Sequence, residues 1–162
     1  METLIDLFEK KVGEYSGNPL LWEKQDGKYL STTYSETREK VHKFAAGLMN
    51  MGIKKGDRVA LLSEGRNDWI ISELAILYTG AINVPLSVKL DATTELKFRL
   101  SHSGSRMIIV SNNQSWKIDA IKKDLPLRMR RGDQLVHAVE CAQQRALAAA
   151  GRADNGGDFT RG

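Results

Sequence analysis

The stretch Asp57–Leu90, DRVALLSEGRNDWIISELAILYTGAINVPLSVKL, decides the fold. It opens with an apolar run of strand length, Val59–Leu62, and a polar loop follows at Glu64–Asn67. Apolar side chains then recur at helical spacing from Trp69 to Tyr78. Gly80 stands where the C-terminus of a helix commonly takes a glycine. These features predict a strand, a loop and an amphipathic helix in direct succession.

A second strand is expected at 81–84, and we expect Pro85 to end its pairing because proline has no N–H to donate. Strand, helix and strand within about thirty residues predict a βαβ unit with a right-handed crossover. The alternation then continues to residue 125. The further expected elements are a helix capped by Asp91 or Thr93, a strand at 107–110, and a helix that starts at Ser115 and is closed by Pro126. The resulting βαβαβα order predicts a parallel sheet of three strands with helices on its faces.

The residues before this unit predict a helix and a β-hairpin. Residues 3–14 form an amphipathic pattern behind the capping residue Thr3. Strands are expected at 19–22 and 29–34, joined by a tight turn at Asp26-Gly27. A further helix, capped by Ser35 and ended by Gly52, leads into Asp57. The fold class is therefore α/β, with an N-terminal helix and hairpin followed by half of a usual doubly wound sheet.

Composition narrows the class of protein. The chain has 162 residues, 41% of them apolar and 27% charged, as in ordinary globular proteins. The net charge of +4 is scattered along the sequence, which argues against a nucleic-acid-binding protein. No apolar run reaches the roughly 20 residues that a transmembrane helix needs, and the N-terminus does not resemble a signal peptide. The single Cys141 fits a reducing compartment, so we expect a cytoplasmic protein.

Composition changes abruptly after Pro126. Residues 1–126 contain thirteen Lys and ten Ile, whereas residues 127–162 contain neither and hold six Arg and seven Ala. Because Ala, Arg and Gly share GC-rich codons and Lys and Ile share AT-rich ones, the change suggests a shifted reading frame or a different source of DNA. We therefore expect residues 127–162 to be unrelated or frameshifted, with helical spacing from Leu135 to Ala149 and disorder from 151 to 162.

Five motifs together resemble one enzyme family. Ser63–Trp69 resembles the "SENRPEW"-like segment of AMP-forming acyl-CoA synthetases, especially long-chain fatty-acid–CoA ligases. The other matching segments, in the family's order and spacing, are Thr33–Glu36, Gly52–Ala60, Gly80–Leu86 and the pair Glu95–Leu100 with Ser103–Met107. The resemblance covers residues 3–125, and it identifies residues 1–126 as part of the family's N-terminal domain.

The resemblance implies a full-length enzyme of fatty acid metabolism that joins ATP and a fatty acid into an acyl-adenylate and then acylates CoA, with Mg²⁺ assisting. The family's Ser/Thr/Gly-rich phosphate loop ending in Pro-Lys-Gly is absent from this sequence. So are its Tyr-Gly-x-Thr-Glu segment, its ribose-binding Asp and its adenylating Lys. Adenylation needs the phosphates held by backbone N–H groups and cations. We therefore assign no catalytic, cofactor-binding or metal-binding residue to this chain and expect it to be inactive alone.

One loop offers a candidate ligand site. Ser63–Asn67 follows a parallel strand, at the edge where open α/β sheets place ligands. Arg66 lies beside a predicted helix start, where an anion is favoured. The alternative is a solvated loop charge that pairs with Glu64 or Asp68, and we prefer that alternative.

The remaining notable side chains favour ordinary structural roles. His42, His102 and His137 have no ligand at metal-binding spacing and are expected on surfaces or helix faces. Cys141 has no histidine positioned to activate it. The Trp residues are expected as core or rim anchors, and the short basic groups as solvated ends of elements. These residues are Trp22, Trp69, Trp116, Lys54-Lys55, Lys122-Lys123 and Arg128–Arg131.

Three functional hypotheses follow. The preferred one is an N-terminal fragment of a fatty-acid–CoA ligase. The second is a non-catalytic α/β module that binds a partner chain or a nucleotide-like ligand. The third is a truncated product without function, which would be poorly soluble because its half-sheet leaves an open strand edge and apolar faces uncovered. Self-association through that edge is a further expectation.

Overall fold

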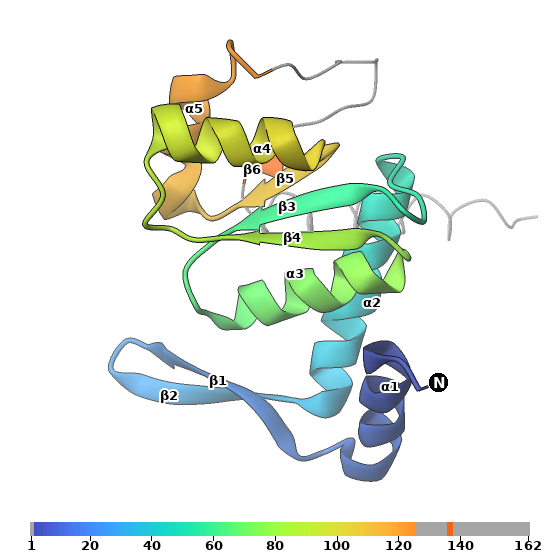
Figure 1. Cartoon of the computed structure of the whole chain (residues 1–162). Helices are drawn as coiled ribbons and strands as arrows, with labels where there is room; N and C mark the ends of the chain where they lie inside the picture. The colour runs from blue at the N-terminus through green and yellow to red at the C-terminus, as the bar shows by residue number, and fades with distance from the viewer. Residues whose placement is uncertain (1, 126–135, 138–162) are drawn as a thin grey trace, which may run out of the picture.

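The computed structural model describes residues 2–125 and 136–137 as an α/β fold (Figure 1). The elements come in the predicted order, with a helix and a hairpin before the alternating strands and helices. Their bounds are α1 Leu4–Tyr15, β1 Pro19–Gln25, β2 Lys28–Thr33, α2 Tyr34–Asn50, β3 Arg58–Leu62, α3 Asn67–Tyr78, β4 Ile82–Leu86, η1 Ala92–Leu96, α4 Lys97–Ser103, β5 Met107–Val110, η2 Asn112–Gln114, α5 Ser115–Ile121 and β6 Val136–His137.

Threonine caps begin the first two helices. The Thr3 hydroxyl accepts from the backbone N–H of Asp6 at 3.1 Å, and the Asp6 carboxylate accepts from the N–H of Thr3 at 2.9 Å. Thr33 and Glu36 form the same reciprocal capping box at the start of α2. The prediction that Ser35 caps this helix is therefore wrong. The carboxylate three residues after Thr33 completes the box, and Ser35 lies inside the first turn.

The predicted hairpin turn is confirmed. Asp26 and Gly27 have φ values of 49° and 81°, the left-handed conformations that a tight two-residue hairpin turn needs. The register places Trp22 opposite Ser31 and Glu23 opposite Leu30. Figure 1 shows the hairpin on the far side of α3 from the parallel sheet, with its tip extending beyond that helix.

The parallel sheet has the order β4-β3-β5-β6, so β3 is flanked by β4 and β5, and the predicted strands are all present. Pro85 was expected to end the pairing of β4, and this prediction is wrong. Pro85 pairs with Leu61, and the ladder continues to Leu86. Proline is tolerated here because β4 lies at the edge of the described sheet and has one neighbour, β3.

Two residues of the tail lie within the described part of the chain. Val136 pairs with Ile109 and His137 with Val110, which makes β6 a short parallel strand beside β5. The prediction of helix is therefore wrong at these two positions. The rest of the predicted helix at 135–149 and the segment 151–162 lie outside the described residues.

The sheet separates two apolar cores, as expected for an α/β fold. Side chains alternate along β3, so Val59 and Leu61 face α1, α2 and α3, while Ala60 and Leu62 face η1, α4 and α5. Phe44 and Leu48 of α2 are completely buried in the first core. In Figure 1, α4 and α5 lie on one side of the strands and α3 on the other.

The ends of the last two helices can be compared with expectation. Of the two predicted caps, Asp91 is the one that begins the helix after β4, because its carboxylate accepts from the backbone N–H groups of Thr93 and Thr94. That helix starts with a π-helical turn, η1, before continuing as α4. The helix α5 ends at Ile121, before Pro126 is reached.

The C-terminus of α3 packs against a lysine from the preceding loop. Gly80 follows this helix with a φ of 74°, a conformation that side chains rarely adopt. A Cβ atom at this position would lie 3.1 Å from Cγ of Lys55 and 3.2 Å from its Cβ. The stem of Lys55, predicted as a solvated end, therefore covers the end of the helix while the residue remains exposed.

Candidate functional site: the carboxyl edge of the parallel sheet

The carboxyl ends of β3 and β5 meet at the point where the chain changes sides of the sheet. The chain leaves β3 for α3 on one face and leaves β5 for α5 on the other. Such a topological switch point is where open α/β sheets usually bind ligands. The loop Ser63–Arg66 and the turn Ser111–Gln114 are thus brought together, and the sequence alone indicated only the first of them.

Glu64 fills this position with its own hydrogen bonds. Ser111 Oγ donates to Glu64 Oε2 at 2.6 Å, and Gln114 Nε2 donates to Oε1 at 2.7 Å. Both partners lie about fifty residues further along the chain. Glu64 therefore joins the two loops, and its carboxylate is directed at protein groups.

The charge state of Glu64 follows from these contacts. Burial raises the pKa of its carboxyl group, because a charged group loses hydration there. The hydrogen bonds from Ser111 and Gln114, a backbone hydrogen bond and the positive charge of Arg66 outweigh this effect. The pKa of Glu64 consequently lies below its ordinary value. An ionised carboxylate at the switch point repels phosphate and carboxylate ligands.

Arg66 is a solvated loop charge paired with a nearby carboxylate, which is the alternative preferred from the sequence. Its Nη2 lies 3.5 Å from Asp68 Oδ2, as predicted, and its Nε lies 3.6 Å from Glu23 Oε1. The partner Glu23 comes from β1, so the pair also connects the hairpin to the start of α3, a contact that the sequence did not indicate. With 40% of its side chain exposed, Arg66 is a solvated charge between two carboxylates.

A buried lysine lies below the same edge and was missed by sequence reasoning. Lys117 of α5 is only 7% exposed, and its ammonium donates to the backbone oxygens of Val88 and Leu90, the latter at 3.1 Å. It ties α5 to the loop after β4. Its place in the sequence, beside Ile118 on a short helix, gives no signal of this role. Gln114 Oε1 is buried with no hydrogen-bond partner in the described part of the chain.

His42 lies on a partly exposed face of α2, as predicted, but it has partners that the sequence did not indicate. Its Nε2 lies 3.0 Å from Glu9 Oε1, and its ring meets Tyr78 edge-on with 4.8 Å between ring centroids. The sequence could not indicate this contact, because Glu9 lies 33 residues away. His102 stacks on Phe98 on the surface of α4, as expected for a helix-face residue. His137 lies in β6, and Cys141 and Arg128–Arg131 lie outside the described residues.

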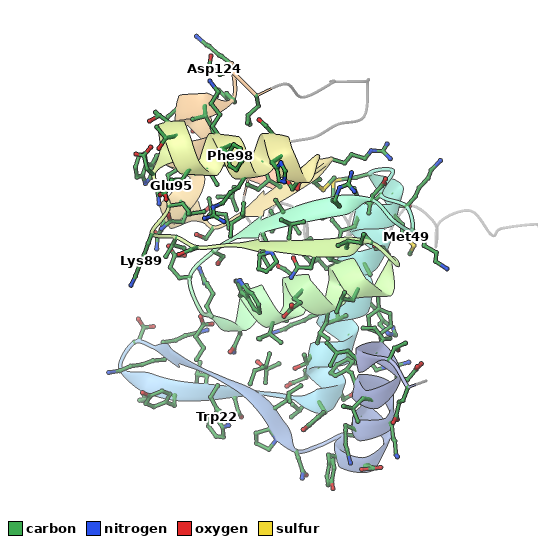
Figure 2. All side chains as sticks on the ribbon, in the orientation of Figure 1. Trp22, Met49, Lys89, Glu95, Phe98 and Asp124 are labelled. Atoms are coloured by element: carbon green, nitrogen blue, oxygen red, sulfur yellow. The ribbon has the colours of Figure 1, made fainter. Side chains whose placement is uncertain are left out.

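The tryptophan prediction holds for one residue of three. Trp69 packs partly buried against the first core. Trp22 and Trp116 are 57% and 60% exposed, so their assignment as anchors is wrong. Trp22 extends from β1 on the side away from α3, where none of the described elements covers it (Figure 2). The sequence pattern of a hairpin by itself does not show which of its two faces packs against the rest of the fold.

No set of three or more His, Cys, Asp or Glu residues within 2–125 and 136–137 is arranged to hold a metal ion. No helix within the same residues is long and apolar enough to cross a bilayer.

Comparison with known proteins identifies the family. The family model described as "AMP-binding enzyme" matches residues 8–158. The chain belongs to the AMP-binding enzyme family. The match runs past Pro126, through the region of altered composition.

Curated proteins similar to the chain include proteins named as acyl–CoA ligases. A long-chain-fatty-acid–CoA ligase of Escherichia coli O6:H1 is 30% identical over 139 residues, which cover 83% of this chain and 24% of the relative. An uncharacterized acyl–CoA ligase, YtcI, of Bacillus subtilis is 32% identical over 66% of this chain and 20% of its own length. The chain thus spans about a quarter or less of the curated relatives it matches.

A solved structure agrees with the fold. The inhibitor-bound N-terminal domain of FACL13 from Mycobacterium tuberculosis superposes with a TM-score of 0.73 at 24% identity, over 100% of this chain and 39% of that one. The predicted α/β fold, with a helix and a hairpin before a parallel half-sheet, is therefore confirmed.

Proposed function

We propose that this chain is the N-terminal scaffold of a long-chain fatty-acid–CoA ligase and that it does not activate fatty acids by itself. The complete enzyme would use ATP, Mg²⁺ and CoA to convert a fatty acid into its CoA thioester. Two observations carry the proposal: the chain belongs to the AMP-binding enzyme family, and the side chain of Glu64 occupies the switch point of its sheet. Glu64 fills that position through hydrogen bonds from Ser111 and Gln114, and its ionised carboxylate disfavours phosphate there.

The sequence supports the negative part of the proposal. Acyl-adenylate formation needs donors and cations around the α-phosphate as charge develops there. The Gly-rich loop, the ribose-binding Asp and the adenylating Lys that the family uses have no counterpart in these 162 residues. Arg66 and Lys117, cations near the carboxyl edge, are already engaged with carboxylates and backbone oxygens.

ATP–pyrophosphate exchange with a series of fatty acids tests the proposal directly. The purified 162-residue chain should give exchange no faster than buffer, whereas a complete ligase assayed in parallel should give a clear signal. Exchange by the chain that requires the fatty acid would refute the proposal.

Equilibrium binding of ATP and of a non-hydrolysable acyl-adenylate analogue separates the scaffold from a binding module. The scaffold predicts no saturable binding of either compound. Saturable binding that Glu64→Gln alters would instead support a ligand site at the switch point and favour the second hypothesis.

The domain boundary and the oligomeric state are parts of the same proposal. Residues 1–126 would be the ligase-like part and 127–162 a tail of different coding origin, a boundary proposed from the change in composition although the family match extends to residue 158. Translating the DNA beyond codon 126 in the other two frames tests this, because a frameshifted ligase would there encode the Gly-rich loop followed by Pro-Lys-Gly.

Self-association through the open sheet edge is expected for an incomplete domain and is measurable as concentration-dependent elution in size-exclusion chromatography. We propose a cytoplasmic location, which fractionation of cells expressing the chain tests.

A further inference from the structure

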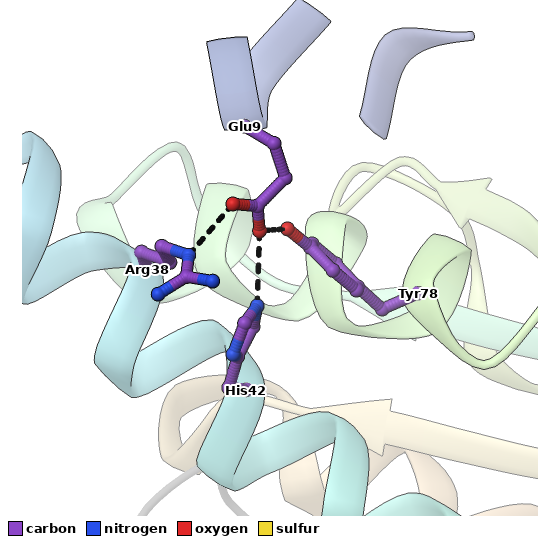
Figure 3. Close-up of polar contacts among 4 residues, drawn as sticks. All are labelled: Glu9, Arg38, His42 and Tyr78. Carbon is purple, nitrogen blue, oxygen red and sulfur yellow. Dashed lines mark hydrogen bonds and ion pairs between the residues drawn. The ribbon is translucent and has the colours of Figure 1, made fainter. Parts of the chain in front are cut away.

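Three helices meet at one carboxylate far from the sheet edge (Figure 3). Glu9 of α1 accepts through Oε2 from Arg38 Nε at 2.7 Å and through Oε1 from His42 Nε2 at 3.0 Å, both on α2. The hydroxyl of Tyr78, the last residue of α3, donates to the same Oε1. Because an ionised carboxylate only accepts, His42 acts here as the donor. One side chain of α1 is thus held by three donors from two other helices.

The apolar attachment of α1 to the rest of the protein is small. Its buried side chains are Phe8 and Val12, and Ile5 is partly buried against the same core. Leu4 and Leu7 are 55% and 42% exposed, so part of the apolar surface of this helix faces solvent. A helix of twelve residues is only marginally stable on its own in water, whatever the quality of its cap. The packing of α1 against α2 and α3 therefore depends on few contacts, and the three hydrogen bonds of Glu9 are among them.

The connection after α1 is fixed to the rest of the fold. The backbone N–H of Ser35 donates to Ser16 O at 3.1 Å, and that of Tyr34 donates to Asn18 O at 3.0 Å. Both bonds lie at the start of α2. The end of α1 next to Ser16 is consequently held, while Glu9 and the N-terminal turn lie beyond this tether.

We propose that α1 is a strap that opens and closes as a unit about its tethered C-terminal end, and that Glu9 is its latch. Opening would uncover the apolar surface of α2 and α3 that Phe8 and Val12 cover, while the sheet, α2 and α3 stay folded. The latch suits reversible opening because Arg38 and His42 have 45% and 40% of their side chains exposed. Water can replace Glu9 at these donors, so release leaves no buried unpaired charge.

The same exposure makes the latch sensitive to salt. Ion pairs near the surface weaken as the Debye length falls from about 10 Å at 0.1 M to about 3 Å at 1 M ionic strength. Opening of α1 should therefore increase with salt, whereas a strap held by apolar contacts alone would not respond in this way.

Hydrogen exchange of the full 162-residue chain tests the strap. In the wild type, the amides of α1 should exchange faster than those of β3 and α3, and with little dependence on low urea concentrations, as expected for local opening. Glu9→Gln should accelerate exchange in α1 by roughly three- to tenfold, the scale of one or two half-exposed charge-assisted hydrogen bonds, and leave β3 unchanged.

Glu14→Gln is the matched control. It also removes one carboxylate from α1, but Glu14 pairs only with Lys11 on the same helix among the contacts described for it. It should leave exchange in α1 within a factor of two of wild type, and 1 M NaCl should narrow the difference between Glu9→Gln and wild type.

Tyr78→Phe provides a second approach from the other side of the latch, since it removes one donor and keeps the ring against His42. It should accelerate exchange in α1 in the same direction as Glu9→Gln. The proposal is overturned if α1 exchanges only together with β3 in the wild type. It is also overturned if Glu14→Gln matches the effect of Glu9→Gln, or if both latch variants accelerate exchange equally in all elements.

Discussion

Replacing Gly80 by alanine tests how the βαβ unit at 57–90 is closed. Gly80 has a φ of 74°, and an alanine there would place a methyl group 3.1 Å from Cγ and 3.2 Å from Cβ of Lys55. The left-handed conformation costs a non-glycine residue about 1–2 kcal/mol. Crowding against a side-chain stem that can shift by a few tenths of an ångström adds about 1 kcal/mol. We therefore expect Gly80→Ala to lower the free energy of unfolding by about 2–3 kcal/mol.

Urea denaturation followed by far-UV circular dichroism measures this loss. With a slope of roughly 1.5 kcal/mol/M, typical of small domains, a loss of 2–3 kcal/mol shifts the midpoint by roughly 1.3–2 M. Gly17→Ala is the control, because Gly17 has an ordinary φ and no atom within 4 Å of an added Cβ. It should be neutral or stabilising by about 0.4–1 kcal/mol, since alanine restricts the unfolded chain.

A double-mutant cycle with Lys55→Ala separates the two terms. Shortening Lys55 removes Cγ but leaves Cβ near the new methyl group, so part of the crowding should be relieved and the pair should couple favourably by about 0.5 kcal/mol. A Gly80→Ala protein as stable as the Gly17→Ala control would refute the reasoning. A large loss without coupling to Lys55 would assign the whole effect to the backbone conformation.

Three further predictions concern two carboxylates, Glu64 after β3 and Asp91 after β4, and a pair of tryptophans that differ in burial. Because the pKa of Glu64 is lowered, its stabilisation should be complete above its ordinary value of 4.5 and lost as pH falls through the folded value, and Glu64→Gln should remove this dependence in pH-resolved denaturation. The hydrogen bonds from Thr94 and Thr93 lower the pKa of Asp91 to about 2, so nuclear magnetic resonance should find its carboxyl still ionised at pH 3, and substituting Thr94 by valine should raise the titration midpoint. Trp22→Ser should change the free energy of unfolding by less than about 0.5 kcal/mol, whereas Trp69→Ser should cost more than about 1.5 kcal/mol, and equal losses would contradict the burial found here.

Local signals in the sequence were sufficient for the order of elements. The apolar run Val59–Leu62, the helical spacing to Tyr78 and the glycine after it each act over a few residues, so the strand, the helix and its end could be predicted. Asp26-Gly27 likewise fixed the hairpin, because the backbone conformation of a tight turn depends on its own two residues.

The errors arise where a local signal competes with contacts further away. Ser35 is a good capping residue, yet Thr33 caps α2 because Glu36 stands three residues after it. Proline disfavours strand pairing, yet Pro85 pairs because β4 is an edge strand, and edge position depends on the order of strands. Trp22 has strong apolar character, but the hairpin turns the opposite face toward α3.

The polar contacts of the site and of the latch could not be predicted from spacing. Glu64 meets Ser111 and Gln114 across 47 and 50 residues, and Glu9 meets Tyr78 across 69. Such pairs form only when the crossover connections bring two loops or two helices together. The sequence could suggest that Ser63–Asn67 lies at a ligand-binding edge, but not that Glu64 already occupies that edge.

The loop that marks the family therefore has a structural explanation that needs no ligand. Ser63 follows β3 and is buried, and Glu64 joins the loop to the start of α5 through η2. Arg66 then joins the start of α3 to the hairpin through Glu23. These contacts connect the loop after β3 with the turn after β5 and with the hairpin. The contacts described for Glu64 and Arg66 are thus with protein groups, and they hold the motif at 63–69 between segments that lie far apart in the sequence.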